Sequence, residues 1–205
     1  MVEASAILPS SPLDGAMQPG RYGHAGGTAG VAARERRNVA MASVIARRGQ
    51  HTALNVRIKA RAGLDLPATP RFVGVNHLGF LWLAPGQWIA SAEGEVGAVF
   101  ASELAQDLAG LASVTDQSDG RVLLRVSGPR VRDMLAKGCM IDLHSSVFKI
   151  GDTAITSIAL LTVQVTRLPD DAGLAVFEIS VMRSFSANLW YWLESSAAEF
   201  GLDIA

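Results

Sequence analysis

The sequence predicts an α+β fold in which an irregular N-terminal arm is followed by two tandem split β-α-β units. Strand-like and helix-like segments follow one another in the same order twice along the chain. A stretch rich in Gly, Pro, Ser and Ala, without hydrophobic periodicity, precedes them. The predicted boundaries are an arm over residues 1–36, a first unit over residues 37–118 and a second unit over residues 119–205.

The composition is that of a globular protein and excludes several other classes. Hydrophobic residues make up 49% of the 205 residues, enough for a sizeable core. The single cysteine cannot form an internal disulfide, and no apolar run approaches the roughly 20 residues of a membrane helix. The first residues lack the basic and apolar segments of a signal peptide. We therefore expect a cytoplasmic protein without a membrane partner.

Charge is distributed unevenly along the chain. Residues 1–61 carry nine Lys or Arg against three Asp or Glu, whereas the remainder carries nine against sixteen. Three partners are compatible with the basic third: nucleic acid, an acidic protein, or the acidic remainder of the same chain. Nucleic acid is disfavoured, because the arginines are not interleaved with aromatic residues and match no recognition module. These arginines are Arg34, Arg36, Arg37, Arg47 and Arg48.

Within the arm, a glycine-rich stretch runs from Gly23 to Gly30. Its spacing does not fit GxGxxG, no strand precedes it, and no Lys-Ser/Thr pair follows it, so a nucleotide loop is not predicted. We expect the arm to become ordered, if at all, by lying on another polypeptide.

The first unit begins with an apolar strand at Val39–Ala46. The next segment, Thr52–Ala62, is ambiguous, because its apolar residues alternate as in a strand while its composition favours a helix. Gly63 followed by Pro67 is a helix-stop pattern, so a helix is predicted.

The first unit continues with strands at Leu78–Ala84 and Gln87–Ala92, which flank a Pro-Gly pair typical of a type II turn. Glu93 and Glu95 favour the start of a helix, and a strand at Leu111–Thr115 ends the unit. The expected buried face of that helix consists of Val96, Val99, Phe100, Leu104 and Leu108.

The second unit opens with a strand at Val122–Ser127, whose apolar residues alternate with arginines. A helix is expected at Pro129–Lys137, with a left-handed cap at Gly138. The remaining elements repeat the first unit, so both are predicted to be ferredoxin-like; only a last strand is uncertain, because little chain remains for it. They are a hairpin of Ile155–Thr166 and Leu174–Val181 and a helix at Ala187–Phe200.

The last helix carries three consecutive aromatic residues, Trp190, Tyr191 and Trp192. Successive helical residues point about 100° apart, so the three rings cannot share one face. Either the helix is sandwiched within its own domain, or one or two rings anchor a partner subunit.

Two groups of polar residues are candidates for a functional site. Cys139, Asp142 and His144 could suggest a metal or a nucleophile, but further zinc ligands are absent and sequence neighbours on an extended segment alternate faces. A buried cysteine and a hydrogen-bonded Asp-His loop are expected. Asp116 and Asp119 could be paired carboxylates, but their place between two strands favours turn chemistry.

No other constellation points to catalysis. His24, His51 and His77 lie in separate segments, and GxSxG, HExxH, Walker and Rossmann motifs are absent from the sequence. The sequence therefore predicts no catalytic, cofactor-binding or metal-binding residue in this chain.

Four stretches resemble the gamma subunit family of heterotetrameric sarcosine oxidase, over about the last 125 residues. The DQS and SGP patterns also look like the folate-binding superfamily that includes the aminomethyltransferase of glycine cleavage. The four stretches are WLAPGQW (Trp82–Trp88), TDQSDGRVLLRVSGP (Thr115–Pro129), MLAKGCMIDLH (Met134–His144) and RSFSANLWYWL (Arg183–Leu193).

The resemblance implies a complex that oxidatively demethylates sarcosine to glycine, reduces oxygen to hydrogen peroxide and passes the one-carbon unit to tetrahydrofolate. It implies that FAD, FMN, NAD, tetrahydrofolate and zinc are held by other subunits. This chain would then bind no cofactor alone and act as a non-catalytic structural subunit beside the alpha, beta and delta subunits. The alternative is a stand-alone folate-binding or one-carbon (aminomethyl) transfer protein.

Overall fold

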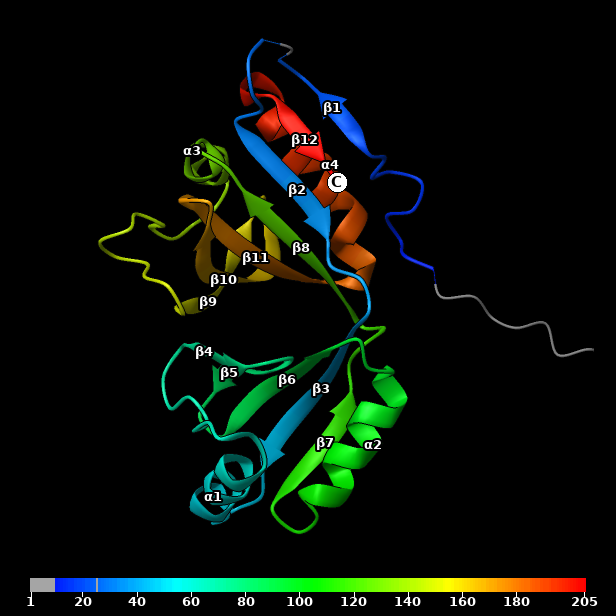
Figure 1. The fold of residues 1–205 in the computed structure, drawn as a ribbon, viewed down its shortest axis with the longest axis vertical. Coiled ribbons are helices and arrows are strands. Elements are labelled where there is room, and N and C mark those ends of the chain that lie inside the picture. The colour runs from blue at the N-terminus through cyan, green and yellow to red at the C-terminus, as the bar shows by residue number, and fades with distance from the viewer. Residues whose placement is uncertain (1–9, 25) are drawn as a thin grey trace, which may run out of the picture.

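The computed structural model describes residues 10–24 and 26–205. Two β-sheets follow one another along the long axis, and each has helices on its outer face (Figure 1). The α+β prediction is confirmed, and no helix in the described ranges is long and apolar enough to cross a membrane. The elements are β1 (Gly20–Tyr22), β2 (Val31–Glu35), β3 (Val39–Ala46), α1 (His51–Ala62), β4 (Phe72–Val75), β5 (Leu78–Ala84), β6 (Gln87–Glu93), α2 (Gly97–Asp107), β7 (Ala112–Asp116), β8 (Arg121–Ser127), α3 (Val131–Ala136), β9 (Thr153–Ile158), β10 (Leu161–Asp171), β11 (Leu174–Met182), η1 (Arg183–Phe185), α4 (Ser186–Ala197), η2 (Ala198–Phe200) and β12 (Leu202–Ile204).

The five-stranded sheet has the order β4-β5-β6-β3-β7, and all its neighbouring strands are antiparallel. Its last four strands, with α1 and α2 between them, have the strand order of a split β-α-β unit. The strand β4, which the sequence analysis did not predict, extends the edge beside β5. It is short and half-exposed, so it carries little hydrophobic signal.

The ambiguous segment is a helix, α1, because its apolar residues are used at helical spacing. Leu54 and Ile58 are fully buried, whereas Val56 between them is 63% exposed. Gly63 ends the helix in the left-handed conformation (φ 70°) and donates its N–H to the carbonyl of Lys59. Residues at i and i+4 share one face of a helix, and here that face packs on the sheet. In a strand, Val56 would lie on the same face as Leu54 and Ile58 and would be buried with them.

The seven-stranded sheet has the order β1-β12-β2-β8-β11-β10-β9. In it β2 lies between β8 and β12, antiparallel to the first and parallel to the second. The prediction of an irregular arm is therefore wrong for β1 and β2, although residues 1–9 and 25 lie outside the described residues. These strands were missed because they are short and contain mostly small or charged residues, which give no apolar alternation.

The described part of the arm lies on its own chain, and the expectation of a partner-bound arm stays a prediction. Leu13 and Val31 are fully buried in the core beneath the seven-stranded sheet, together with Met17 and Ala33. This core also contains residues of α3 and α4. The described part of the arm thus supplies two strands and several core residues to the second unit.

Some predicted details are wrong for steric reasons. Gly138 does not adopt a left-handed conformation; a Cβ there would lie 2.6 Å from the Trp192 ring, so glycine is needed for packing. The segment predicted as one strand at Ile155–Thr166 is two strands, β9 and β10, joined by a tight turn at Ala159 and Leu160. Both turn residues have positive φ, as a two-residue hairpin requires.

The helix α2 starts at Gly97, because Val96 is still extended and Glu93 belongs to β6. Val96 and Val99 are exposed, so only part of the predicted buried face is correct. The core does contain Phe100, Leu104 and Leu108, and through these side chains the helix packs against the sheet.

Candidate interaction site at the junction of the two sheets

The two sheets meet through the faces that carry no helices. Met41 and Ile89 of the small sheet form a separate buried cluster with Leu123 of β8. Outside this cluster, the Gln164 amide donates to the carbonyl of Trp82 (3.0 Å), and Arg71 pairs with Asp152 (2.6 Å). We call this contact region the junction.

The chain enters the junction twice, between β2 and β3 and between β7 and β8. At the second crossing, the Ser118 hydroxyl accepts the N–H of Met41 (2.9 Å) and donates to the Asp116 carboxylate (2.7 Å). Asp116 also accepts the backbone N–H of Ser118 (2.9 Å). The expectation of turn chemistry is confirmed for Asp116, which ties the end of β7 to β3.

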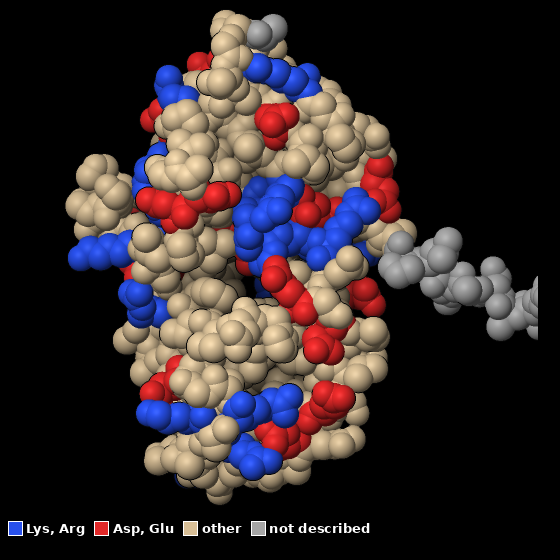
Figure 2. Space-filling model, in the orientation of Figure 1, with Lys and Arg blue, Asp and Glu red and all other residues tan. Residues whose placement is uncertain are grey.

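Arginines gather on the open face of the seven-stranded sheet beside the junction. We call Arg34, Arg36, Arg121 and Arg125 the arginine face; they come from β2, β8 and the residue that follows β2. Figure 2 shows basic side chains concentrated at the middle of the molecule, beside a hollow. Arg34 is directly opposite Arg125 in the register of β2 and β8, an unfavourable pairing of like charges.

One carboxylate, that of Glu178 on β11, serves two of these arginines. Its Oε2 accepts from Arg36 Nη1 (2.7 Å) and from Arg125 Nη2 (3.0 Å). Arg36 also pairs with Glu93 across the junction. In the part of the chain that the structure describes, no ion pair is found for Arg34 or Arg121. Part of the basic third therefore does meet its own chain, as one of the three alternatives anticipated.

The environment of the arginine face is unfavourable to its charge. Burial, and then the positive charges of Arg36 and Arg34, lower the pKa of Arg125 against the opposing effect of Glu178. Burial also lowers the pKa of Arg121. The Nε atoms of Arg121 and Arg125 are buried, and among the described residues they have no hydrogen-bond partner. Positive charge is therefore incompletely compensated here.

A groove of about 480 Å³ lies against this face. Arg34, Arg125 and Ser127 form one wall, and Val176 contributes an apolar surface. The opposite wall is the end of the β10–β11 hairpin, with the carboxylates of Asp170 and Asp171. We call this the arginine groove. One of its walls is positively charged and the other negatively charged.

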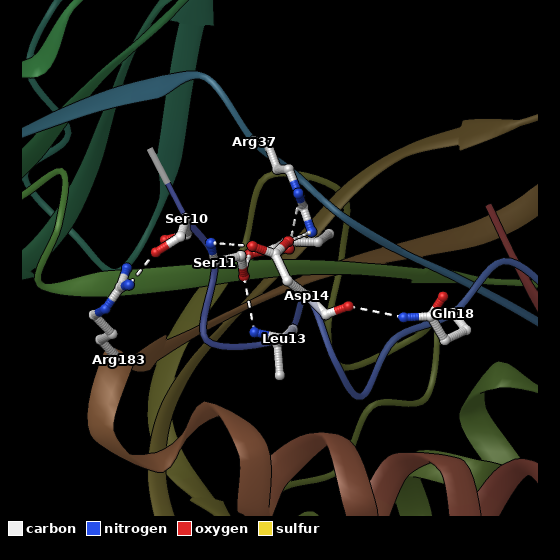
Figure 3. A network of polar contacts seen from close by, with 8 residues as sticks. Ser10, Ser11, Leu13, Asp14, Gln18, Arg37 and Arg183 are labelled. Atoms are coloured by element: carbon white, nitrogen blue, oxygen red, sulfur yellow. Dashed lines mark hydrogen bonds and ion pairs between the residues drawn. The ribbon is translucent and has the colours of Figure 1, made fainter. Parts of the chain in front are cut away.

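A second polar network holds the arm onto the same unit (Figure 3). The Asp14 carboxylate accepts the N–H of Ser11 (2.8 Å) and pairs with Arg37 (2.6 Å), while Arg183 donates to the carbonyl of Ser10 (2.8 Å). The Ser11 N–H, followed by Arg37, lowers the pKa of Asp14. The network fixes the arm beside the chain that leads from β2 into β3.

The structure does not bring Cys139, Asp142 and His144 together as one site. Asp142 accepts the backbone N–H of His144 (2.8 Å), and the His144 ring contacts Ser146 (2.7 Å). Cys139 is half-buried and forms an isolated antiparallel β-bridge with Ile158, the last residue of β9. Burial raises the pKa of the Cys139 thiol. The expected Asp-His loop is confirmed, whereas full burial of the cysteine is not.

The glycine-rich stretch packs the arm against the end of the chain. A Cβ at Gly30 would lie 2.8 Å from the Phe200 carbonyl oxygen, and a Cβ at Gly23 (φ 74°) would lie even closer to the Ala198 carbonyl oxygen. Gly128 of the SGP motif approaches the Gly30 carbonyl in the same way. These glycines permit close contact between backbones.

The histidines and the aromatic helix residues are also dispersed. The His51 ring contacts Trp88 in a tilted arrangement (centroids 5.4 Å apart, interplanar angle 49°), far along the chain from the arm residue His24. Trp190 is buried and donates to the carbonyl of Ala16 (3.2 Å), so this ring belongs to its own domain. Tyr191 is 73% exposed, and a partner contact there stays a prediction.

The sequence suggested three partners for the basic third, but it did not predict that Arg34, Arg36, Arg121 and Arg125 form one arginine face. The available signal was the alternation of Arg34 with Ala33 and of Arg125 with Leu124 and Val126. That pattern indicates basic residues on one side of a strand, but it does not show that β2 pairs with β8.

Comparison with known proteins decides the family. The model of the sarcosine oxidase, gamma subunit family matches residues 48–199. The chain belongs to this family. Sarcosine oxidase subunit gamma of Corynebacterium sp. (strain U-96) is 29% identical over 147 residues, which are 70% of this chain and 68% of that protein. The subunit from strain P-1 is 32% identical over 127 residues, which are 62% of this chain and 60% of that protein.

Solved structures agree with this family. A chain of the heterotetrameric sarcosine oxidase from Corynebacterium sp. U-96, in complex with pyrrole 2-carboxylate, has a TM-score of 0.72 at 27% identity. The match covers 83% of this gamma-family chain and 85% of that chain. Aminomethyltransferase T of the glycine cleavage system from Bartonella henselae has a TM-score of 0.58 at 18% identity, over 83% of this chain and 49% of that one. The second likeness shows a shared fold.

Proposed function

We propose that this chain is a non-catalytic structural subunit of a heterotetrameric sarcosine oxidase complex. The similarity to a chain of such a complex, over 83% of this chain, is the observation that carries the proposal. The complex would demethylate sarcosine oxidatively, and the flavins, NAD, zinc and tetrahydrofolate would belong to the alpha, beta and delta subunits.

The use of the polar residues supports a structural role. Asp116 and Ser118 join strands at the junction, Asp142 holds a turn, and Asp14 fastens the arm. Within the described ranges, His, Cys, Asp and Glu side chains form no group of three that could hold a metal ion. Asp116 and Asp142, two of the polar residues considered as possible site residues, thus each have a local structural partner.

The proposal is tested by co-expression with the other three subunits and by calorimetric titration of the isolated chain with tetrahydrofolate. We expect co-purification in one complex and no saturable heat of folate binding. Tight tetrahydrofolate binding by a chain that captures no other subunit would instead support the stand-alone folate-binding or aminomethyl-transfer alternative, whose fold this chain shares.

A further inference from the structure

We infer that the arginine groove is a docking site for an extended segment of another subunit, which places a carboxylate side chain between Arg34 and Arg125. The inference rests on the proposed function, because it requires that the chain is assembled with other polypeptides. It goes further by naming the surface and the chemistry of the segment that binds there.

The positive wall of the groove lacks a full complement of carboxylate partners. Glu178 accepts hydrogen bonds from Arg36 and Arg125, and Arg36 also pairs with Glu93, whereas Arg34 has no ion pair to any residue that the structure describes. Arg34 faces Arg125 across the strand pair, and both Arg34 and Arg36 disfavour the charge on Arg125. An additional carboxylate at this wall would relieve the repulsion and could accept paired hydrogen bonds from a guanidinium.

The carboxylates of the opposite wall restrict the class of ligand that can bind. Asp170 pairs with Arg167, whereas Asp171 lines the groove without an ion pair to any residue in the described ranges. A phosphate group or a nucleic acid would be attracted by one wall and repelled by the other. A polypeptide segment can present a carboxylate to Arg34 and an amide N–H or a lysine to Asp171.

The shape and position of the groove suit the side chains of a polypeptide segment. Its volume of about 480 Å³ accommodates several side chains, and Val176 and Leu168 supply apolar surface within it. Both long edges of β2 are already paired, with β8 and with β12. The segment would therefore be recognised through side chains on an open sheet face, without the addition of a strand.

Competitive incorporation into the complex tests this inference. Wild-type and Arg34→Glu chains with different affinity tags are co-expressed with the other subunits, and mass spectrometry measures their ratio in the purified complex. We expect the Arg34→Glu chain to be under-represented by about tenfold or more, because reversing a charge at an interface weakens association. Arg48→Glu, the same change at an exposed arginine beyond β3, should be incorporated like wild type.

A second variant identifies the occupant while keeping the charge. In the complex assembled with Arg34→Lys, a carbodiimide should couple the new amine to an Asp or Glu of another subunit, and peptide mass spectrometry would locate the bond. Equal incorporation of the Arg34→Glu and wild-type chains would overturn the docking inference but leave the proposed function standing. Coupling of the Arg34→Lys amine only to residues of this chain, in an intact complex, would have the same consequence. Failure of the wild-type chain to enter any complex would overturn the proposed function as well.

Discussion

The two units have the same order of helices and strands but complete their sheets differently. In the small sheet, β7 lies beside β3 and closes the unit with its own last strand. In the seven-stranded sheet, the corresponding place beside β8 is taken by β2 of the arm, and β12 lies one strand further out. A repeated order of elements therefore does not imply that each half is self-sufficient.

Strand length explains the difference. β7 has five residues and pairs with β3 over all of them, whereas β12 has only three. A three-residue strand could not satisfy the edge of the seven-residue β8. β2 covers β8 over four register positions and brings Val31 and Ala33 into the core. The buried core of the first unit, in contrast, uses only residues between Ala40 and Ala112.

Separating the units should give the largest effect. We expect a fragment of residues 37–118 to fold alone and a fragment of residues 119–205 to remain unfolded, because the second core lacks Leu13, Met17, Val31 and Ala33. Amide-proton NMR dispersion measures this. Adding residues 10–36 as a peptide should restore the chemical-shift dispersion of the second fragment. Cooperative folding of that fragment without the peptide would contradict the conclusion that the second unit needs the arm.

A methyl group at the contact between arm and second unit should have the next largest effect. A Cβ at Gly128 (φ 122°) would lie less than 3.0 Å from the carbonyl oxygen of Gly30, so Gly128→Ala should cost about 4 kcal/mol. Gly110 in the first unit also has positive φ (80°) but open space around it, so Gly110→Ala should cost about 1 kcal/mol. Denaturant unfolding compares the two; equal losses would show that backbone conformation alone matters.

Leu13→Ala tests whether the arm is part of a core. Leu13 is fully buried, so we expect a loss of about 3 kcal/mol from the transfer and cavity terms together. Hydrogen exchange should accelerate in β8 and β11 and stay unchanged in β3. Leu160→Ala, at a side chain that is 96% exposed, should change stability by less than about 0.5 kcal/mol. Faster exchange in both sheets would argue against a separate second core.

The smallest effect concerns pH and contrasts one carboxyl group in each unit. The pKa of Asp14 is lowered chiefly by the Ser11 N–H, and that of Asp65 by hydrogen bonds from Lys59 and Asn55. A depressed folded-state pKa stabilises the fold above the ordinary Asp pKa of about 3.9, and this contribution is lost as pH falls through the folded-state value.

We therefore expect Asp14→Asn to remove a small pH dependence of arm protection, and Asp65→Asn to act only on the first unit. Carbon-13 NMR titration of the two carboxyl groups, together with hydrogen exchange, checks this. An Asp14 pKa at the ordinary value would contradict the arm network of Figure 3.

Local patterns predicted most of the elements that pack on their neighbours in sequence. The strand β3 and the β5–β6 hairpin follow from apolar runs and from the Pro-Gly turn, and α1 from helix propensity and a glycine stop. The turn role of Asp116 could also be predicted, because an Asp side chain bonds the backbone within two residues of itself.

The sequence by itself thus determined the α+β class, the order of most elements, and the motifs that resemble the gamma subunit family. Only the tertiary structure decided that the arm supplies β2 between β8 and β12, because a strand of five residues gains its pairing and burial from segments about 90 and 170 residues away. It also decided the arginine groove, since Arg34 and Arg125 are brought opposite one another by that pairing alone. Alternation along a strand indicates which face is buried, but it does not indicate which distant strand will pair with it.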